Sequence, residues 1–216
     1  MSENDFASRL AAATPTPGGG AAAARVGLFA TSLLRMAASI TLSKTTPEEK
    51  STETALAAVR EVSERAAHLG DEFRRLEEAD IEAFENYLSS LRLPKTTPQE
   101  KSRRQRARLD AARRATEVPL ATLETALQTM ALCRRLQELG STLRLRAESD
   151  VGGALELAHA AFRAAELNVR SNLPTLEDSE RVRLQGRFKE CVSQLEHDYP
   201  RLRRAMLTWL ESPQKK

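Results

Sequence analysis

The chain has 216 residues, with 33 basic and 30 acidic side chains and a formal net charge of +3, so its charge balance requires neither a nucleic-acid nor a membrane partner. Aromatic residues make up only 4% of the chain, while alanine, leucine, arginine and glutamate are abundant. This composition disfavours a sheet-rich fold and predicts an all-α protein, large enough to bury a core.

The cysteines and histidines carry no metal or disulfide pattern. Cys133 and Cys191 are far apart with no CxxC spacing, and the histidines are scattered, at His68, His159 and His197. We therefore expect no disulfide and no metal site, and two reduced cysteines in a cytoplasmic protein. His159 lies among alanines and leucines and is expected to pack in a core or an interface.

The N-terminus and the apolar runs predict neither a leader nor a membrane anchor. Glu3 and Asp5 stand where a signal peptide carries basic residues. The longest apolar run, residues 21–42, is interrupted by Arg25 and Arg35 and falls short of a membrane span.

Helical patterns follow one another along the chain with short connections, and they predict a single-domain bundle of about eight helices over residues 1–216. Pro94 is expected to end a helix and Pro119 to break or kink one, while Pro47 and Pro98 are expected to begin helices. Residues 80–91 are expected either to continue the preceding helix or to start a new one. Residues 140–148 are expected to be irregular, and Ser149 or Asp150 to cap the helix that follows. Residues 211–216 are expected to form a disordered tail. The expected helices cover about residues 5–13, 20–41, 47–78, 80–91, 98–117, 119–139, 151–169 and 176–210.

The most informative segment reads Thr-Pro-Thr-Pro-Gly-Gly-Gly at 14–20 and leads into an alanine-rich helix. The prolines restrict the approach, and the glycines leave the backbone amides uncovered. Free amides and the positive end of the helix dipole would then face an anionic or acceptor-rich ligand. The alternative is a rigid turn that only starts the helix.

Further segments occur in a fixed order. They are Pro-Thr-Pro-Gly-Gly-Gly at 15–20, Leu-Ser-Lys at 42–44, Asp-Ile-Glu-Ala-Phe at 80–84, Leu-Pro-Lys-Thr-Thr-Pro-Gln-Glu-Lys at 93–101 with Val-Pro-Leu at 118–120, and Ser-Asp-Val-Gly at 149–152 with Asn-Val-Arg-Ser-Asn-Leu at 168–173. Together they resemble the formiminotetrahydrofolate cyclodeaminase and methenyltetrahydrofolate cyclohydrolase family. The resemblance spans most of the chain.

The resemblance implies an all-helical cytoplasmic homodimer of one-carbon metabolism that uses no metal and no cofactor beyond its tetrahydrofolate substrate, with or without a polyglutamate tail. Two reactions remain open. One hydrolyses 5,10-methenyltetrahydrofolate to 10-formyltetrahydrofolate, and the other forms the methenyl compound from 5-formiminotetrahydrofolate with release of ammonia. The chain would act as a stand-alone enzyme, with no formiminotransferase domain attached.

The resemblance also implies roles for particular residues. Asp80 is expected to transfer protons, its pKa raised by the neighbouring Glu77 and Glu78, and Asp150 to stabilise a cationic centre from a helix N-terminus. For both aspartates a helix cap is the alternative. Lys44 is counted with these two aspartates as a catalytic residue and is expected to contact the pterin carbonyl or the glutamate tail, although a solvated lysine explains it equally. The expected substrate-binding residues are Thr16, Pro17, Gly18, Gly19, Gly20, Lys95, Asn168 and Asn172, the last with a helix C-cap as its alternative.

Two features keep other functions open. Residues 141–148 lack the asparagines usual in the family, and residues 45–47 lack its lysines, which would suit a non-catalytic member that binds folate or another partner. Residues 101–114 hold seven basic side chains and one acid, Asp110. That run is the basis of a competing hypothesis, a helical nucleic-acid-binding module, although it lacks interleaved aromatic residues.

Overall fold

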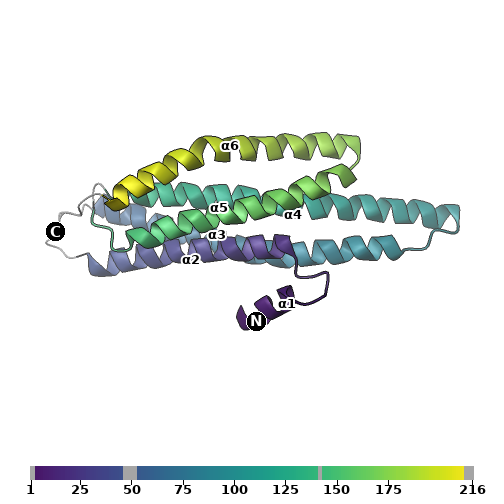
Figure 1. Cartoon of the computed structure of the whole chain (residues 1–216), viewed down its shortest axis with the longest axis horizontal. Coiled ribbons are helices and arrows are strands. Elements are labelled where there is room, and N and C mark those ends of the chain that lie inside the picture. The colour runs from purple at the N-terminus through teal and green to yellow at the C-terminus, as the bar shows by residue number, and fades with distance from the viewer. Residues whose placement is uncertain (1–2, 46–52, 141–142, 212–216) are drawn as a thin grey trace.

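Long helices build the whole of the described chain, which comprises residues 3–45, 53–140 and 143–211 of a computed structural model. Those residues form no strand. The elements in chain order are α1 (Glu3–Leu10), α2 (Gly19–Lys44), α3 (Glu53–Arg92), α4 (Pro98–Leu139), α5 (Glu148–Asn172), a 3-10 turn η1 (Leu173–Thr175) and α6 (Asp178–Glu211). The all-α prediction is therefore confirmed (Figure 1).

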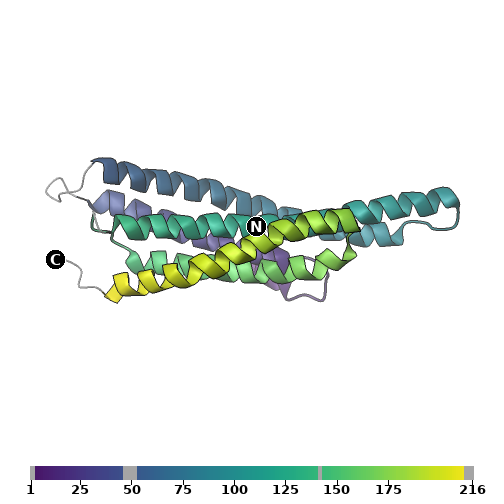
Figure 2. The same cartoon turned by 90° about the horizontal axis from the view of Figure 1, so that it is seen from above.

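Four helices form the core of the bundle. α2 packs against α3 and α5, and α4 packs against the same two helices. α6 lies along the outside, against α4 and α5, and α1 lies apart from the bundle beside the start of α2 (Figure 1). The C-terminal end of α3 and the N-terminal end of α4 project beyond the other helices as a two-helix arm, which Figures 1 and 2 show from two sides.

The described residues contain six α-helices, so the expectation of about eight is wrong. Residues 80–91 continue α3 without a break, and α4 runs through Pro119. A proline inside a helix removes one N–H and so leaves the carbonyl four residues earlier unpaired. α4 stays continuous because a side chain supplies the missing donor, as the site shows below. Pro47 and residues 212–216 lie outside the described residues.

The connection before α5 is part of the core. Leu143, Leu145 and Ala147 are buried in alternation, and the Arg146 backbone N–H donates to Thr41 Oγ1 over 3.3 Å. The unusual sequence of this segment thus has a packing role over residues 143–147, while residues 141–142 lie outside the described part. The N-cap of α5 is Ala147, which forms no side-chain cap bond, so the prediction that Ser149 or Asp150 caps this helix is wrong.

α2 is central and unusually apolar. Among the described helices it is the one whose length and composition would allow it to cross a membrane, with a mean hydropathy of 1.4 over an 18-residue window. This differs from the expectation that no run is long enough. A core helix passes the same test, and α2 packs closely on two others. Only 39% of that window is buried, so much of its apolar surface faces outward.

A close contact between the middle of α2 and α3 depends on a missing side chain. A Cβ placed on Gly27 would lie 2.3 Å from the ring of Phe73, which is fully buried. Gly27→Ala should therefore lower the free energy of unfolding by about 1–3 kcal/mol through overpacking. Urea unfolding followed by circular dichroism measures this. Gly186→Ala is the control, because its Cβ meets nothing within 4 Å, and it should raise stability by about 0.5–1 kcal/mol. Equal stability of the two variants would contradict the packing argument.

Candidate functional site

The start of α2 is capped by a side chain from α3. Gly18, the N-cap residue, makes no side-chain cap bond. Instead the Ala21 N–H donates to Asp80 Oδ2 over 2.8 Å, across 59 residues of sequence. A Cβ on Gly20 would lie only 2.0 Å from Asp80 Oδ1. The absence of a side chain on Gly20 therefore lets the carboxyl group lie directly against the backbone. The helix N-terminus was expected to bind an acceptor from a ligand, and one acceptor that it binds is the protein's own Asp80.

Burial raises the pKa of Asp80 above its ordinary value, while the bond from Ala21 lowers it by less. Glu77, one turn earlier on α3, is buried too, but its carboxylate is paired with the Arg25 guanidinium, with Arg25 Nε 2.6 Å from Oε2. Arg25 in turn lies 4.3 Å over the ring of Phe6 of α1. The expected rise is therefore present, but its leading cause is desolvation rather than repulsion from Glu77 and Glu78.

Asp80 lines a pocket of about 240 Å³. The pocket lies where α3, α4 and α5 meet residues 14–20, which we call the glycine loop. Several residues predicted from the sequence come together there. The lining consists of Pro15, Thr16, Gly18, Gly19, Gly20, Asp80, Phe84, Ala115, Asn168, Ser171 and Asn172. The pocket thus combines one desolvated carboxyl group with amide, hydroxyl and backbone groups, which suits a ligand rich in both hydrogen-bond donors and acceptors.

Asn172 supplies a hydrogen-bond donor that the backbone of α4 lacks. Pro119 has no N–H, so the carbonyl of Ala115, four residues earlier, has no helical donor. The Asn172 side-chain amide donates to that carbonyl over 2.6 Å. Asn168, one turn earlier on α5, donates to the Ala164 carbonyl over 3.0 Å. Both amides face the pocket with their orientation fixed by these bonds.

The loop and an aromatic ring complete the pocket. The Thr16 hydroxyl donates to Glu85 Oε1 over 3.0 Å, which ties the loop to α3, and the Thr16–Pro17 peptide bond is cis. Phe84, four residues after Asp80, is 39% exposed and lines the pocket, so its face is available to a planar ring. Sequence reasoning assigned no role to Phe84 or Glu85, although Phe84 stands one helical turn from Asp80.

Four predicted residues lie elsewhere. Pro17 is buried and outside the pocket lining. Lys44 ends α2 and Asp150 lies in the first turn of α5, at the other end of the bundle. The helical rise between Gly20 and Lys44 is about 36 Å, so within one chain Lys44 does not reach Asp80. Lys95 lines a separate pocket on the arm.

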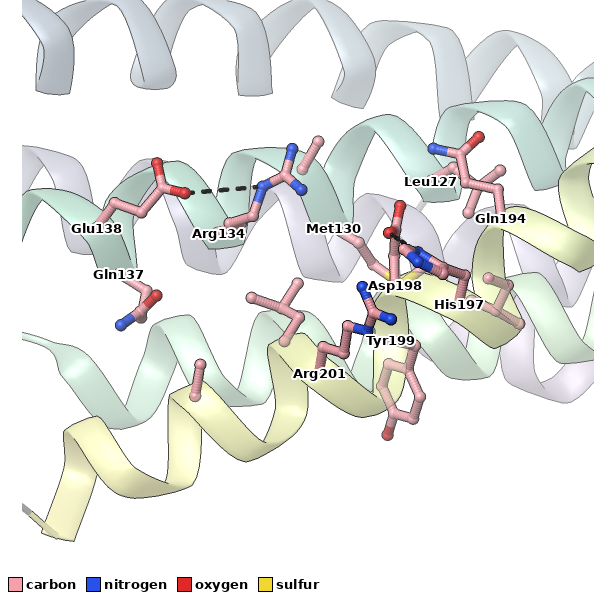
Figure 3. Close-up of a pocket in the computed structure, with 14 residues that line it drawn as sticks. Leu127, Met130, Arg134, Gln137, Glu138, Gln194, His197, Asp198, Tyr199 and Arg201 are labelled. Carbon is pink, nitrogen blue, oxygen red and sulfur yellow. Dashed lines mark hydrogen bonds and ion pairs between the residues drawn. The ribbon is translucent and has the colours of Figure 1, made fainter.

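A larger groove, of about 390 Å³, lies between α4 and α6, and Figure 3 shows its side chains. Four of its charged or titratable side chains lie in pairs: Arg134 lies 3.9 Å from Glu138, and His197 lies 2.8 Å from Asp198 (Figure 3). None of the residues predicted for the site lies in this groove. We therefore place the candidate site at Asp80.

The remaining predictions about histidine and cysteine concern packing. His159 is half-buried and stacks on Tyr199 of α6, with ring centroids 3.8 Å apart, as a packing role predicts. Burial and the charge of Arg163 lower its pKa. Cys133 and Cys191 are buried and free. Among the residues the structure describes, no three side chains of the metal-binding types gather in one place.

Comparison with known proteins gives one consistent family. The sequence profile of the formiminotransferase-cyclodeaminase family matches residues 2–187. The methenyltetrahydrofolate cyclohydrolase of Methylorubrum extorquens is 34% identical over 185 residues, which cover 86% of this chain and 84% of that protein. The rat formimidoyltransferase-cyclodeaminase is 30% identical over 173 residues, which are 80% of this chain but only 30% of the rat protein.

A solved structure has the same fold. The formiminotetrahydrofolate cyclodeaminase of Thermotoga maritima superposes with a TM-score of 0.79 over 97% of this chain and 98% of that one, at 24% sequence identity. The profile match and the bacterial relative carry the assignment, and the superposition supports the fold. The chain belongs to the formiminotransferase-cyclodeaminase family.

The link between Pro119 and Asn172 can be tested by a double-mutant cycle. Asn172→Ala should lower the free energy of unfolding by about 1–3 kcal/mol, because it leaves the Ala115 carbonyl without a donor. In a Pro119→Ala background residue 119 supplies its own N–H, so the same change should cost distinctly less. Urea unfolding of the four proteins measures the coupling. An equal cost of Asn172→Ala in both backgrounds would contradict it.

Proposed function

We propose that this protein is a cytoplasmic one-carbon folate enzyme, and that it acts at the methenyl centre of tetrahydrofolate in the pocket of Asp80. The observation that carries the proposal is the partly buried Asp80 carboxyl group, with its raised pKa, set against the glycine loop. A family relative that matches over 84% of its own length is named a methenyltetrahydrofolate cyclohydrolase, which favours hydrolysis. The cyclodeaminase reaction is the second candidate, because the Thermotoga protein of the same length is named for it.

In the hydrolytic reaction, water adds to the carbon between N5 and N10 and gives a tetrahedral intermediate. The bond from that carbon to N5 then breaks, which leaves a formyl group on N10. The attacking water loses both of its protons: one is transferred to N5, and the other is released to solvent as the formyl C=O bond forms. The pocket must therefore support two transfers, removal of a proton from the water and delivery of a proton to N5. Asp80 is the group we assign to both transfers, because burial brings its pKa closer to the pH at which proton exchange is efficient.

The deaminating reaction forms the methenyl centre that the hydrolytic reaction consumes. N10 attacks the formimino carbon and loses its proton, which gives a tetrahedral intermediate. The leaving nitrogen gains two protons, one equivalent to the proton lost by N10 and one from solvent, and we assign their delivery to Asp80; ammonia then leaves as its bond to the carbon breaks. The methenyl cation is the product here and the substrate in the hydrolysis, so one carboxylate stabilises it in both. Asn168 and Asn172 present amides to the pterin ring, and Phe84 offers it a stacking surface.

Asp80→Asn should keep the fold, because an amide oxygen still accepts from Ala21, and should lower kcat by about 10²–10⁴-fold. In the unaltered enzyme kcat/KM should fall as the pH is lowered, with a midpoint above the ordinary Asp value of 3.8, because the reactive form is the carboxylate and burial favours the acid. Loss or formation of the methenyl chromophore measures both.

The matched control is Asp71→Asn, which alters an exposed carboxylate on the same helix, 2.5 Å from Arg74, and should leave kcat unchanged. Full turnover by Asp80→Asn would remove Asp80 from the mechanism. Folate binding without turnover in the unaltered protein would instead support the non-catalytic reading.

The unit of function that we propose is a homodimer joined through α2 and α5. Val26, Phe29, Leu33, Met36 and Ile40 are spaced three and four residues apart on α2 and form one apolar stripe. Phe29 is 39% and Met36 41% exposed, and the other three are partly exposed. Such a row on one helix is the pattern of a helix–helix interface.

α5 extends this surface. Leu157, Ala160, Ala164 and Leu167 follow the same spacing, and Leu167 is 68% exposed. A Cβ on Gly153 of α5 would lie 3.6 Å from Leu33, so the two stripes are adjacent. We call these residues of α2 and α5 the α2–α5 patch. A second copy of the chain fits it because a two-fold axis pairs a surface with itself.

A two-fold axis through the middle of the patch sets each α2 antiparallel to its counterpart. The end of α2 that carries Lys44 then meets the partner's glycine loop, and the partner subunit's Asp150 approaches the pocket of Asp80. This arrangement explains why the resemblance marks residues at both ends of the bundle. The site is then complete only between two subunits.

Mixed dimers test the shared site. Asp80→Asn and Asp150→Asn proteins, co-expressed with different tags and isolated as mixed dimers, should recover about half of the unaltered activity, because one of the two sites keeps both aspartates. Each variant alone should be nearly inactive. Absence of recovery would overturn the shared site while leaving the role of Asp80 intact.

The role of the patch is tested in the same format. Phe29→Glu should yield monomers of 23.9 kDa by light scattering and abolish the recovery. Leu207→Glu is the control, because Leu207 is 42% exposed on α6, outside the patch, and this change should preserve the dimer. Association of the unaltered protein with lipid vesicles in place of dimerisation would overturn the patch as a dimer interface.

A further inference from the structure

Two contacts in succession join the first turns of α2 to the middle of α3. In the first, the Ala21 N–H donates to Asp80 Oδ2. In the second, the Arg25 guanidinium donates two hydrogen bonds to the Glu77 carboxylate, from Nε to Oε2 over 2.6 Å and from Nη2 to Oε1. Four residues on α2 and three on α3 separate the two contacts, a helical rise of about 4.5–6 Å. The ion pair therefore lies one helical turn from the contact that holds Asp80.

This ion pair is shielded from water. Only 17% of the Arg25 side chain and 8% of the Glu77 side chain are exposed. Phe6 of α1 is itself buried, and the Arg25 guanidinium carbon lies 4.3 Å from the centre of its ring. An aromatic face attracts a cation placed over it and keeps solvent away from that side. Each charge of the pair thus acts on its neighbours with little screening by water.

The pocket itself supplies no competing charge. Asp80 is the one titratable side chain among the described residues that line it, since the glycine loop, α4 and α5 contribute uncharged groups. Arg25 of α2 and Glu77 of α3 are the buried charges one turn away. Further carboxylates on this part of α3 are exposed and screened by water, namely Glu78, Glu82 and Glu85.

Desolvation, rather than repulsion from Glu77, raises the pKa of Asp80. Yet the two residues are three apart on one helix, a spacing that places their side chains on the same face. A second carboxylate so near would by itself raise the pKa of Asp80 further. The guanidinium of Arg25, bonded to both oxygens of Glu77, offsets that repulsion.

We propose that Arg25 is a positioning residue that acts on the pocket through Asp80: it cancels the charge of the buried Glu77 and so keeps the Asp80 carboxylate available to take up a proton. This inference rests on the function proposed above. Neither Arg25 nor Glu77 lines the pocket, so neither touches the substrate that we propose for it. Phe6 links α1 to the same unit, because its ring covers the cation.

The two partners of the ion pair should have opposite effects on Asp80. Arg25→Met leaves the Glu77 charge unbalanced, and should raise the midpoint of the Asp80 ionisation by about one pH unit. Glu77→Gln leaves the Arg25 cation unbalanced and should lower that midpoint by about one pH unit. The double variant Arg25→Met/Glu77→Gln removes both charges and should return close to the unaltered midpoint. A purely structural role would move both single variants in the same direction.

The carboxyl ¹³C resonance of Asp80, followed by NMR as the pH is varied in protein without substrate, measures this ionisation without requiring turnover. Its absence from the spectrum of Asp80→Asn assigns the resonance. The pH dependence of kcat/KM in the same four proteins should show the same order of midpoints. Shifted NMR midpoints with an unshifted kcat/KM profile would support the effect of Arg25 on Asp80 and count against the proposed reaction.

The matched control is the exposed ion pair of Arg74 and Asp71 on α3. Arg74→Met and Asp71→Asn should each leave the midpoint of Asp80 unchanged, because water screens both charges.

Each single change in the buried pair leaves a charge without its partner, so circular dichroism checks that every variant folds. Where Arg25→Met fails to fold, Glu77→Gln and the double variant decide the question. An unchanged Asp80 midpoint in Glu77→Gln, or shifts of both single variants in the same direction, would overturn the proposal.

Discussion

The hydrogen bond from the Ala21 amide to Asp80 is the constraint on which the site depends. α2 begins without a cap of its own, and a carboxyl group from the middle of α3 supplies one. To reach the amide the carboxyl must lie against Gly20, where any larger residue would collide with it. Burial of the carboxyl group in this position raises its pKa, and the bond from Ala21 lowers it by less. The side chain that caps α2 is thus also the one for which we propose proton transfer, so a capping role and a catalytic role of Asp80 do not exclude each other.

A second unpaired backbone group, on α4, also receives its hydrogen-bond partner from another helix. Pro119 deprives the Ala115 carbonyl of its donor, and Asn172 supplies one from α5. The defect in α4 therefore orients an amide of the pocket. In both cases an unsatisfied backbone group of one helix holds a polar side chain of another, which explains how a bundle of regular helices presents a polar pocket without losing backbone hydrogen bonds.

The distribution of charge and apolar surface extends the site beyond this pocket. Toward the arm, cations without carboxylate partners line a neighbouring pocket on the same side of α4. Away from the arm, the α2–α5 patch leaves apolar side chains exposed, and Lys44 and Asp150 lie beyond it. The apolar patch is the surface for which we propose a second subunit as the partner. Both surfaces follow from how the helices are placed rather than from any one motif.

The sequence by itself determined the helical class, the start of α4 at Pro98 and several residues of the pocket, because composition and helix starts are local properties. It overestimated the number of helices, since a donor from a helix distant in sequence lets α4 continue through Pro119. Local spacing also did not predict that Lys44 and Asp150 lie far from Asp80 within one chain. The order of motifs along the sequence does not give the distance that a long helix places between them. Only the tertiary structure decided that Asp80 caps α2 and that Lys101, Arg104 and Arg108 face one pocket. The physical reason is that desolvation and hydrogen-bond partners arise from packing between segments far apart in the chain.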